Sequence, residues 1–161
     1  MAWTALRTWV TGEIVTAAML NEQIRDNLGV LDNYLGAGVV NFAEDATGAT
    51  TVSSTSYAAD SPAVAVTCTT GTSAWLVAQA SVEGPTGAVL NMSYAVSGAS
   101  TIAAADARSQ RIIGNANAVD ITLARKVTGL TAGSNTFTLH WKVASGSAFP
   151  NYRRLAIFPI R

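Results

Sequence analysis

Charged side chains are scarce in this sequence. Asp, Glu, Lys and Arg make up 12% of its 161 residues, and ten basic residues balance ten acidic ones, so the formal net charge is zero. An average soluble protein has about a quarter of its residues charged, and a nucleic-acid-binding domain ordinarily carries a basic patch. We therefore expect no nucleic-acid partner. With 49% hydrophobic residues, the chain is suited to burying surface against partners.

Cysteine and histidine occur once each, as Cys68 and His140. One cysteine cannot form a disulfide within the chain, and the two residues supply too few ligands for a metal site of the Cys/His type. His140 has the outward parity of a strand, so we expect it to be exposed rather than to activate a nucleophile. Cys68 shares the inward parity of Val64, which predicts a packing role. No cofactor and no metal are expected.

Paired carboxylates, which a glycosidase needs across a cleft, are also missing from the pattern. The candidates are Asp60, Glu83, Asp106 and Asp120, and they are scattered over turns and strand exteriors, where we expect them to be solvated. No glycine-rich loop follows a strand and opens a helix, as a phosphate site would require. The sequence therefore indicates that the protein is not an enzyme, with a depolymerase as the less favoured alternative.

No apolar run approaches the 18 residues that a membrane-spanning helix needs. The first twelve residues mix Trp3, Arg7 and Trp9 with threonines and lack the apolar core of a secretory signal. We expect synthesis in a cytoplasm and no membrane insertion.

One amphipathic helix is predicted near the start of the chain. Its apolar residues recur in steps of four, four, three and four, at Leu20, Ile24, Leu28, Leu31 and Leu35. Thr16 is a suitable N-cap, and the glycines at 36 and 38 end the pattern. An isolated helix of about 20 residues with one apolar face is marginal in water and needs a partner. We therefore predict that residues 1–38 form an anchoring and oligomerisation segment.

After residue 38 the periodicity changes from helical to alternating. Alternation runs through residues 63–68, 74–82, 90–96, 119–127 and 136–143, and weaker strands are expected at 39–42, 50–58, 102–104, 108–113 and 152–160. Turn residues rich in glycine, proline and serine separate them. Eight to ten strands at this spacing predict an antiparallel β-sandwich, jelly-roll-like, over residues 39–161. The predicted fold class is mainly β with an N-terminal α-helical segment.

Aromatic and arginine residues give further predictions. Trp3 and Trp9 are costly to leave in water, so they either cover the chain's own helix or act in oligomerisation or docking. Trp75 and Val77 point outward in their strand and are expected at subunit contacts. Arg153 and Arg154 are adjacent and should point to opposite faces, one exposed and one paired.

Two segments of the sequence carry a resemblance to a known group of proteins. The opening segment is made of Trp3, Thr8-Trp9-Val10, Gly12-Glu13, Val15-Thr16-Ala17-Ala18, Leu20-Asn21 and Ile24-Arg25-Asp26-Asn27-Leu28. The closing segment is made of the turn Gly129 to Gly133, then Phe137 to Lys142, Arg153-Arg154-Leu155 and Phe158-Pro159-Ile160. Each covers about 35 residues of the chain. Together they resemble structural proteins of tailed bacteriophages, of the minor tail or fibre-like kind.

The resemblance implies a virion component whose N-terminal segment anchors or trimerises it and whose β-domain is displayed. It favours a fibre-like protein that binds other virion proteins of the tail, the portal region or the capsid, and whose β-domain is available for attachment to a host-surface glycan or protein. Oligomerisation or docking then falls to Trp3, Trp9 and the helix stripe. The alternatives are a capsid decoration protein that stabilises the head, and a carbohydrate-binding module that stacks Trp75, Tyr94 or Tyr152 on sugar rings.

Overall fold

The computed structural model describes residues 8, 10–26, 28, 40–46, 48–114 and 116–160. The chain divides into two compact units, Met1–Val39 and Val40–Arg161. None of the helices in the described ranges has the length and hydropathy that a membrane span requires.

Over the described residues, the helix of the first unit is less regular than the sequence predicts. One α-helical turn, α1 (Ala17–Leu20), is followed by the π-helix η1 (Asn21–Asp26). The N-cap prediction is confirmed, because the Thr16 hydroxyl accepts a hydrogen bond from the backbone N–H of Met19 at 3.3 Å. The expectation of about four regular α-helical turns is wrong over this stretch, since the hydrogen bonding changes to the wider π pattern at Asn21.

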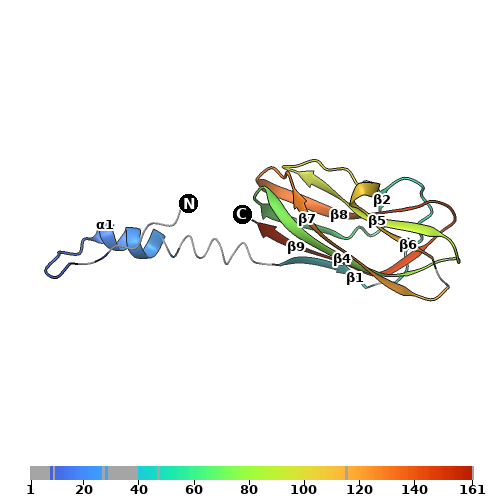
Figure 1. Cartoon of the computed structure of the whole chain (residues 1–161), viewed down its shortest axis with the longest axis horizontal. Coiled ribbons are helices and arrows are strands. Elements are labelled where there is room, and N and C mark those ends of the chain that lie inside the picture. The colour runs from blue at the N-terminus through green and yellow to red at the C-terminus, as the bar shows by residue number, and fades with distance from the viewer. Residues whose placement is uncertain are drawn as a thin grey trace. The chain divides into compact units, whose positions relative to one another are not determined.

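The second unit consists of two antiparallel sheets packed face to face, which confirms the predicted β-sandwich (Figure 1). The first sheet has the order β1 (Asn41–Asp45), β9 (Phe149–Ile160), β4 (Ser73–Glu83) and β7 (Val119–Thr128). In the second, β2 (Ala58–Ala59) and β3 (Ala65–Thr70) share one edge of β8 (Gly133–Val143), which is followed by β5 (Val89–Gly98) and β6 (Gln110–Ile113). Mainly β structure is therefore the correct fold class.

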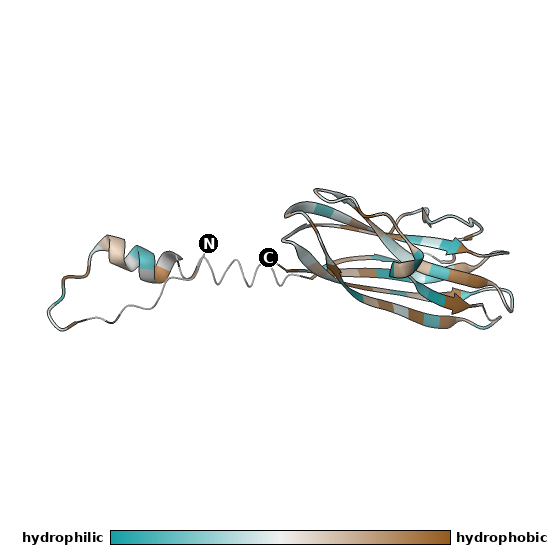
Figure 2. Ribbon diagram, turned by 45° about the horizontal axis from the view of Figure 1, so that its top comes forward, coloured by the Kyte–Doolittle hydropathy of each residue, from teal (hydrophilic) through white to brown (hydrophobic). Residues whose placement is uncertain are grey.

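Alternation of apolar and polar residues along the strands creates the core (Figure 2). Successive side chains of a strand point to opposite faces of the sheet, so one parity of each strand meets the facing sheet. The largest fully buried apolar side chains are Leu76, Leu90, Met92, Tyr94, Phe137, Leu139, Trp141, Leu155 and Ile157. Both sheets contribute to this set, so the core lies between them.

Two of the weaker predicted strands are wrong. Residues 50–58 contribute only the bridge Val52–Ala148 before β2 begins, and residues 102–104 only the bridge Val96–Ile102. In the first case the Ser54 hydroxyl accepts from the backbone N–H of Ser56 at 3.1 Å, and such local side-chain bonds compete with strand pairing. In the second, residues 99–109 fold back onto β5 instead of extending a sheet.

The two ends of the sandwich differ in what they carry. At one end, which we call the tether end, β1 begins beside Ile157, and the backbone N–H of Gly71 donates to the carbonyl of Ile160 at 3.0 Å. At the other, the loop end, the connections 84–88 and 144–148 and residues 114 and 116–118 lie beside the ends of β4, β8 and β6, respectively. The chain therefore enters and leaves the sandwich at the tether end.

Candidate functional site

The predicted oligomerisation and docking residues lie in the first unit. Ile24 and Leu28 are 52% and 56% exposed, and Leu20 lies in α1. Trp3, Trp9, Leu31 and Leu35 lie outside the described residues. Ile24 and Leu28 thus expose about half of their surface, as expected for the apolar face of a helix that packs on a partner.

A buried ionic cluster joins the two sheets. Arg153 of β9 is 1% exposed, and its guanidinium contacts the carboxylates of Asp45 in β1 and Asp60, the latter at 2.9 Å. Asp60 lies in the break between β2 and β3, at the edge of the second sheet. The prediction that Asp60 is solvated is therefore wrong. Burial raises the pKa of Asp60, and the Arg153 charge opposes that rise. Being enclosed, the cluster connects the sheets and offers no accessible catalytic pair.

Arg154 points the other way, which confirms the prediction of opposite faces. Its side chain is 48% exposed and pairs with Glu44 of β1 at 3.1 Å. Both arginines are therefore paired, one inside the sandwich and one on its surface.

The other sequence candidates for chemistry are dispersed. Cys68 is buried as expected, and Glu83 and Asp120 are exposed as expected. His140 is half-buried rather than exposed, and this burial lowers its pKa. Within the described part of the chain, no three His, Cys, Asp or Glu side chains gather as a metal site would need.

An exposed apolar surface covers the outer face of the first sheet near the tether end. We call it the apolar patch, and its members are Phe42, Trp75, Val77, Ala156, Phe158 and Ile160. Trp75 is opposite Phe158 in the β4–β9 pairing, and Val77 is opposite Ala156. Phe42 is 57% exposed and Trp75 49%. Contiguous apolar surface of this kind marks interaction sites, and the predicted outward orientation of Trp75 is confirmed.

A β-bulge interrupts the first sheet beyond the patch. The β4–β9 register shifts between Gln79 and Ser81, and Tyr152 has φ 47°, a value that bulky residues rarely adopt. Tyr152 is 57% exposed and lines a hollow of about 390 Å³ with Asp120 and Arg154. Of the three aromatics considered for sugar stacking, Trp75 and Tyr152 are exposed, whereas Tyr94 is 2% exposed in the core.

A polar hollow of about 470 Å³ lies on the outer face of the second sheet. Its floor is one cross-strand row, because Asn91 of β5 is opposite both Arg111 of β6 and Lys142 of β8. Its wall includes Ser109 and Asp106, which begins the short 3-10 helix η2 (Asp106–Arg108). We call this site the polar hollow.

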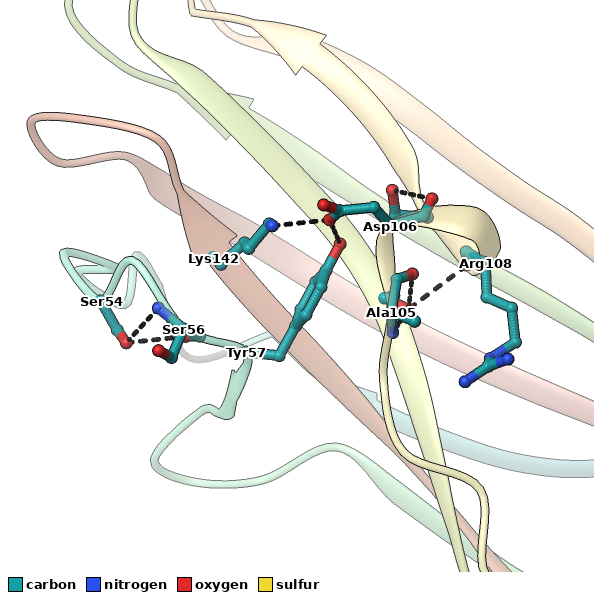
Figure 3. Close-up of polar contacts among 9 residues, drawn as sticks. Ser54, Ser56, Tyr57, Ala105, Asp106, Arg108 and Lys142 are labelled. Atoms are coloured by element: carbon teal, nitrogen blue, oxygen red, sulfur yellow. Dashed lines mark hydrogen bonds and ion pairs between the residues drawn. The ribbon is translucent and has the colours of Figure 1, made fainter.

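A hydrogen-bonded network holds one side of the polar hollow (Figure 3). Asp106 accepts a hydrogen bond from the Tyr57 hydroxyl at 2.8 Å and pairs with the Lys142 ammonium at 2.6 Å. The same ammonium lies 4.9 Å from the centre of the Tyr57 ring. The hydrogen bonds from Lys142 and then Tyr57 hold the pKa of Asp106 below its usual range, and burial raises the pKa of Tyr57 to about 12. Asp106 is exposed as expected, yet its carboxylate is held in place.

Sequence reasoning missed Tyr57, Asn91 and Arg111 as members of a site. Strand parity places Asn91 on an outer face, but no local pattern shows which strands flank it. The relevant pairings join residues about 20 and 50 positions apart, and only the sheet order brings them together.

Comparison with known proteins gives fold similarity only. No protein-family model matches the sequence, and no curated protein matches it. The chain is structurally similar to a chain of infectious bursal disease virus, Gx strain, at 9% identity and a TM-score of 0.42, over 74% of this chain and 29% of that one. It is also similar to a cycloisomaltooligosaccharide glucanotransferase of Paenibacillus sp. complexed with cycloisomaltoheptaose, at 15% identity and a TM-score of 0.34, over 81% and 22%. The chain spans less than a third of either protein.

Proposed function

We propose that this chain is a non-enzymatic structural protein of a tailed-bacteriophage particle. In this proposal it is a fibre-like component, in which residues 1–38 attach it to the tail or head and residues 39–161 form the displayed domain. The resemblance of the opening and closing segments to phage virion proteins supports the class. The arrangement of the sandwich supports the display role.

One observation supports the display role: the first and the last strand residue of the sandwich lie at the same end of it. Asn41, the first residue of β1, and Ile160, the last of β9, both lie at the tether end. Residue 40 therefore continues into the sandwich at the tether end, which is distinct from the end that carries the loops 84–88 and 144–148. The strand order supports a jelly roll, since two sets of four strands, β1-β9-β4-β7 and β3-β8-β5-β6, form the two sheets.

The proposed assembly is a homotrimer, and the proposed occupant of the apolar patch is a second copy of this chain. Phe42 of the patch lies in β1, immediately after the segment that carries the helix stripe. In this proposal the N-terminal segment holds the copies together, and the patch is the contact between neighbouring sandwiches. Lys126 and the Glu44–Arg154 ion pair lie at the margins of the patch. Together they carry a net charge of only +1.

Particle composition tests the virion assignment. In particles purified from the phage that encodes this chain, mass spectrometry should detect it as a stoichiometric component, and antibodies to the sandwich should label the particle surface in electron micrographs. Its absence from purified particles, with the protein abundant in the infected cell, would overturn the proposal.

Deletion of residues 1–35 separates the fibre-like role from a decoration role. A fibre-like protein should lose particle binding, because in that role only its N-terminus contacts the particle. A decoration protein needs broad contact with the shell and should still bind. Light scattering on the full chain should give about three times its 16.6 kDa mass, and a monomer at micromolar concentration would contradict the trimer.

A further inference from the structure

The floor of the polar hollow is built from three neighbouring strands. Arg111, Asn91 and Lys142 are direct cross-strand partners across β6, β5 and β8, so their side chains lie side by side on the outer face. Arg111 is exposed, and its guanidinium makes no ion pair or hydrogen bond with another residue in the described ranges. A free planar cation thus stands at one end of the row, with a fork geometry that suits a carboxylate.

Asn91 lies in the middle of the row and lines the hollow. Only 8% of the residue is exposed, and no other residue in the described ranges hydrogen-bonds its side-chain amide. The amide is not among the enclosed polar atoms of the described residues that lack a partner, so it is open to the hollow and available to a ligand. An amide offers both a donor and an acceptor, which is what a ligand hydroxyl requires.

The opposite wall supplies an oriented acceptor. The Asp106 carboxylate is held between the Tyr57 hydroxyl and the Lys142 ammonium, at 2.8 and 2.6 Å (Figure 3). A carboxylate fixed in this way can still accept hydrogen bonds from a ligand, because an ionised carboxylate has about four acceptor positions. Beside the polar row lies an apolar one, in which Val89 is opposite Ile113.

These groups together define the ligand chemistry. Arg111 and Lys142 against Asp106 leave one net positive charge, which favours a monoanion. Sulfate has no hydrogen to donate to the Asp106 acceptor, and a dianion, whether sulfate or phosphate, exceeds the single net positive charge of the site. A sugar with a carboxylate uses every group, since its anion pairs with Arg111, its hydroxyls bond Asn91 and Asp106, and its apolar ring face covers Val89. The hollow, at about 470 Å³, lies within the range of small-molecule sites.

We propose that the polar hollow binds a carboxylate-bearing sugar residue of an acidic surface glycan. Arg111 holds the carboxylate, and Asn91 and Asp106 hold ring hydroxyls. The site lies toward the loop end, because Asn91 is close to the start of β5 and Lys142 is one residue from the end of β8. The assignment of this glycan to a host surface rests on the proposed function, whereas the binding chemistry does not.

An NMR titration of the full chain tests the site with D-glucuronate as the probe. D-Glucose is the matched control, because it differs only at C6, where a hydroxymethyl group replaces the carboxylate, and inorganic phosphate tests for simple anion binding. We expect D-glucuronate to bind with a Kd on the order of 1 mM and to shift the Asn91 side-chain amide signals. D-Glucose should bind at least about 10-fold more weakly.

Arg111→Gln is the deciding variant, since Arg111 is exposed and its replacement leaves the core untouched. We expect it to weaken D-glucuronate binding by about 10-fold and to leave D-glucose binding unchanged. Lys126→Gln is the charge-matched control, because Lys126 is an exposed residue on the other sheet. It should bind D-glucuronate as the unaltered chain does.

Three results would overturn the proposal: no D-glucuronate binding at tens of millimolar, equal binding of D-glucuronate and D-glucose, or equal weakening by both variants. A fourth result would also overturn it: phosphate that binds as tightly as D-glucuronate and is equally weakened by Arg111→Gln would show a general anion site and not a sugar site. The proposed function is tested separately: it fails if the chain is absent from purified particles, whatever the result of the sugar titration. In particles, Arg111→Gln should assemble normally and reduce adsorption to cells.

Discussion

The outer faces of the two sheets have opposite characters. The first sheet leaves Phe42 and Trp75 half-exposed with no segment of its own sandwich over them. The second is covered in part by residues 99–109, whose backbone at Ala105 and Arg108 accepts hydrogen bonds from Ser93. A sheet face left apolar needs a partner, whereas a face covered by polar loops offers a shaped site. In our proposal, the first face is therefore the subunit contact and the second is the binding face.

Arg153 connects the two sheets from inside the sandwich, and its loss should have the largest effect on stability. Arg153→Leu leaves Asp45 and Asp60 buried without their cation, and we expect it to lower the free energy of unfolding by about 3–5 kcal/mol. Urea unfolding of purified protein measures this. Arg154→Leu is the control, because its exposed pair with Glu44 should contribute no more than about 1 kcal/mol. Equal losses in the two variants would mean that the cluster does not join the sheets.

The apolar patch should affect assembly rather than folding. Replacing both Trp75 and Phe158 by Ser should weaken subunit association by about 2 kcal/mol or more per residue, since large aromatics dominate contacts of this kind. Light scattering should then give the monomer mass, while the unfolding midpoint extrapolated to the monomer changes little. Ile113→Ser, at a 63% exposed site on the second sheet, should leave the mass unchanged. A trimer that survives the double replacement would place the subunit contact elsewhere.

The network beside the polar hollow should respond to loss of one hydroxyl. Tyr57→Phe keeps the ring near the Lys142 ammonium but removes the hydrogen bond to Asp106. Because that bond helps to lower the pKa of Asp106, we expect the pKa to rise toward its usual value. NMR titration of the Asp106 carboxyl measures the rise. An unchanged pKa in this variant would show that Lys142 alone holds the carboxylate.

The smallest expected effect comes from His140 on the partly covered face. Burial lowers its pKa below 6.5, so the unfolded chain takes up the proton first as the pH falls. The stabilising contribution is therefore present above 6.5 and is lost as the pH falls through the lower folded-state pKa. We expect the Tm to decrease between about pH 7.5 and about pH 5, and to decrease less in His140→Gln. Identical pH profiles for the two proteins would contradict this.

The sequence alone was sufficient for the sandwich and for most strand positions. Period-two alternation is a local property, and it predicted β4, β5, β7 and β8 and the inward parity of Cys68. It failed at residues 50–58 and 102–104, where side-chain bonds to the backbone compete with strand pairing. The regular helix was also wrong where described, because apolar spacing does not distinguish α from π hydrogen bonding.

What only the tertiary structure decided is which residues meet. Asp60 has the local setting of a solvated turn residue, yet the break between β2 and β3 puts it on Arg153, 93 positions away. Arg111, Asn91 and Lys142 become one row solely because β5 lies between β6 and β8. Alternation determines which face of a strand is buried, since that depends on the residues of the strand itself. The order of strands depends on packing across the whole sandwich, so the composition of both outer faces emerges only from the folded chain.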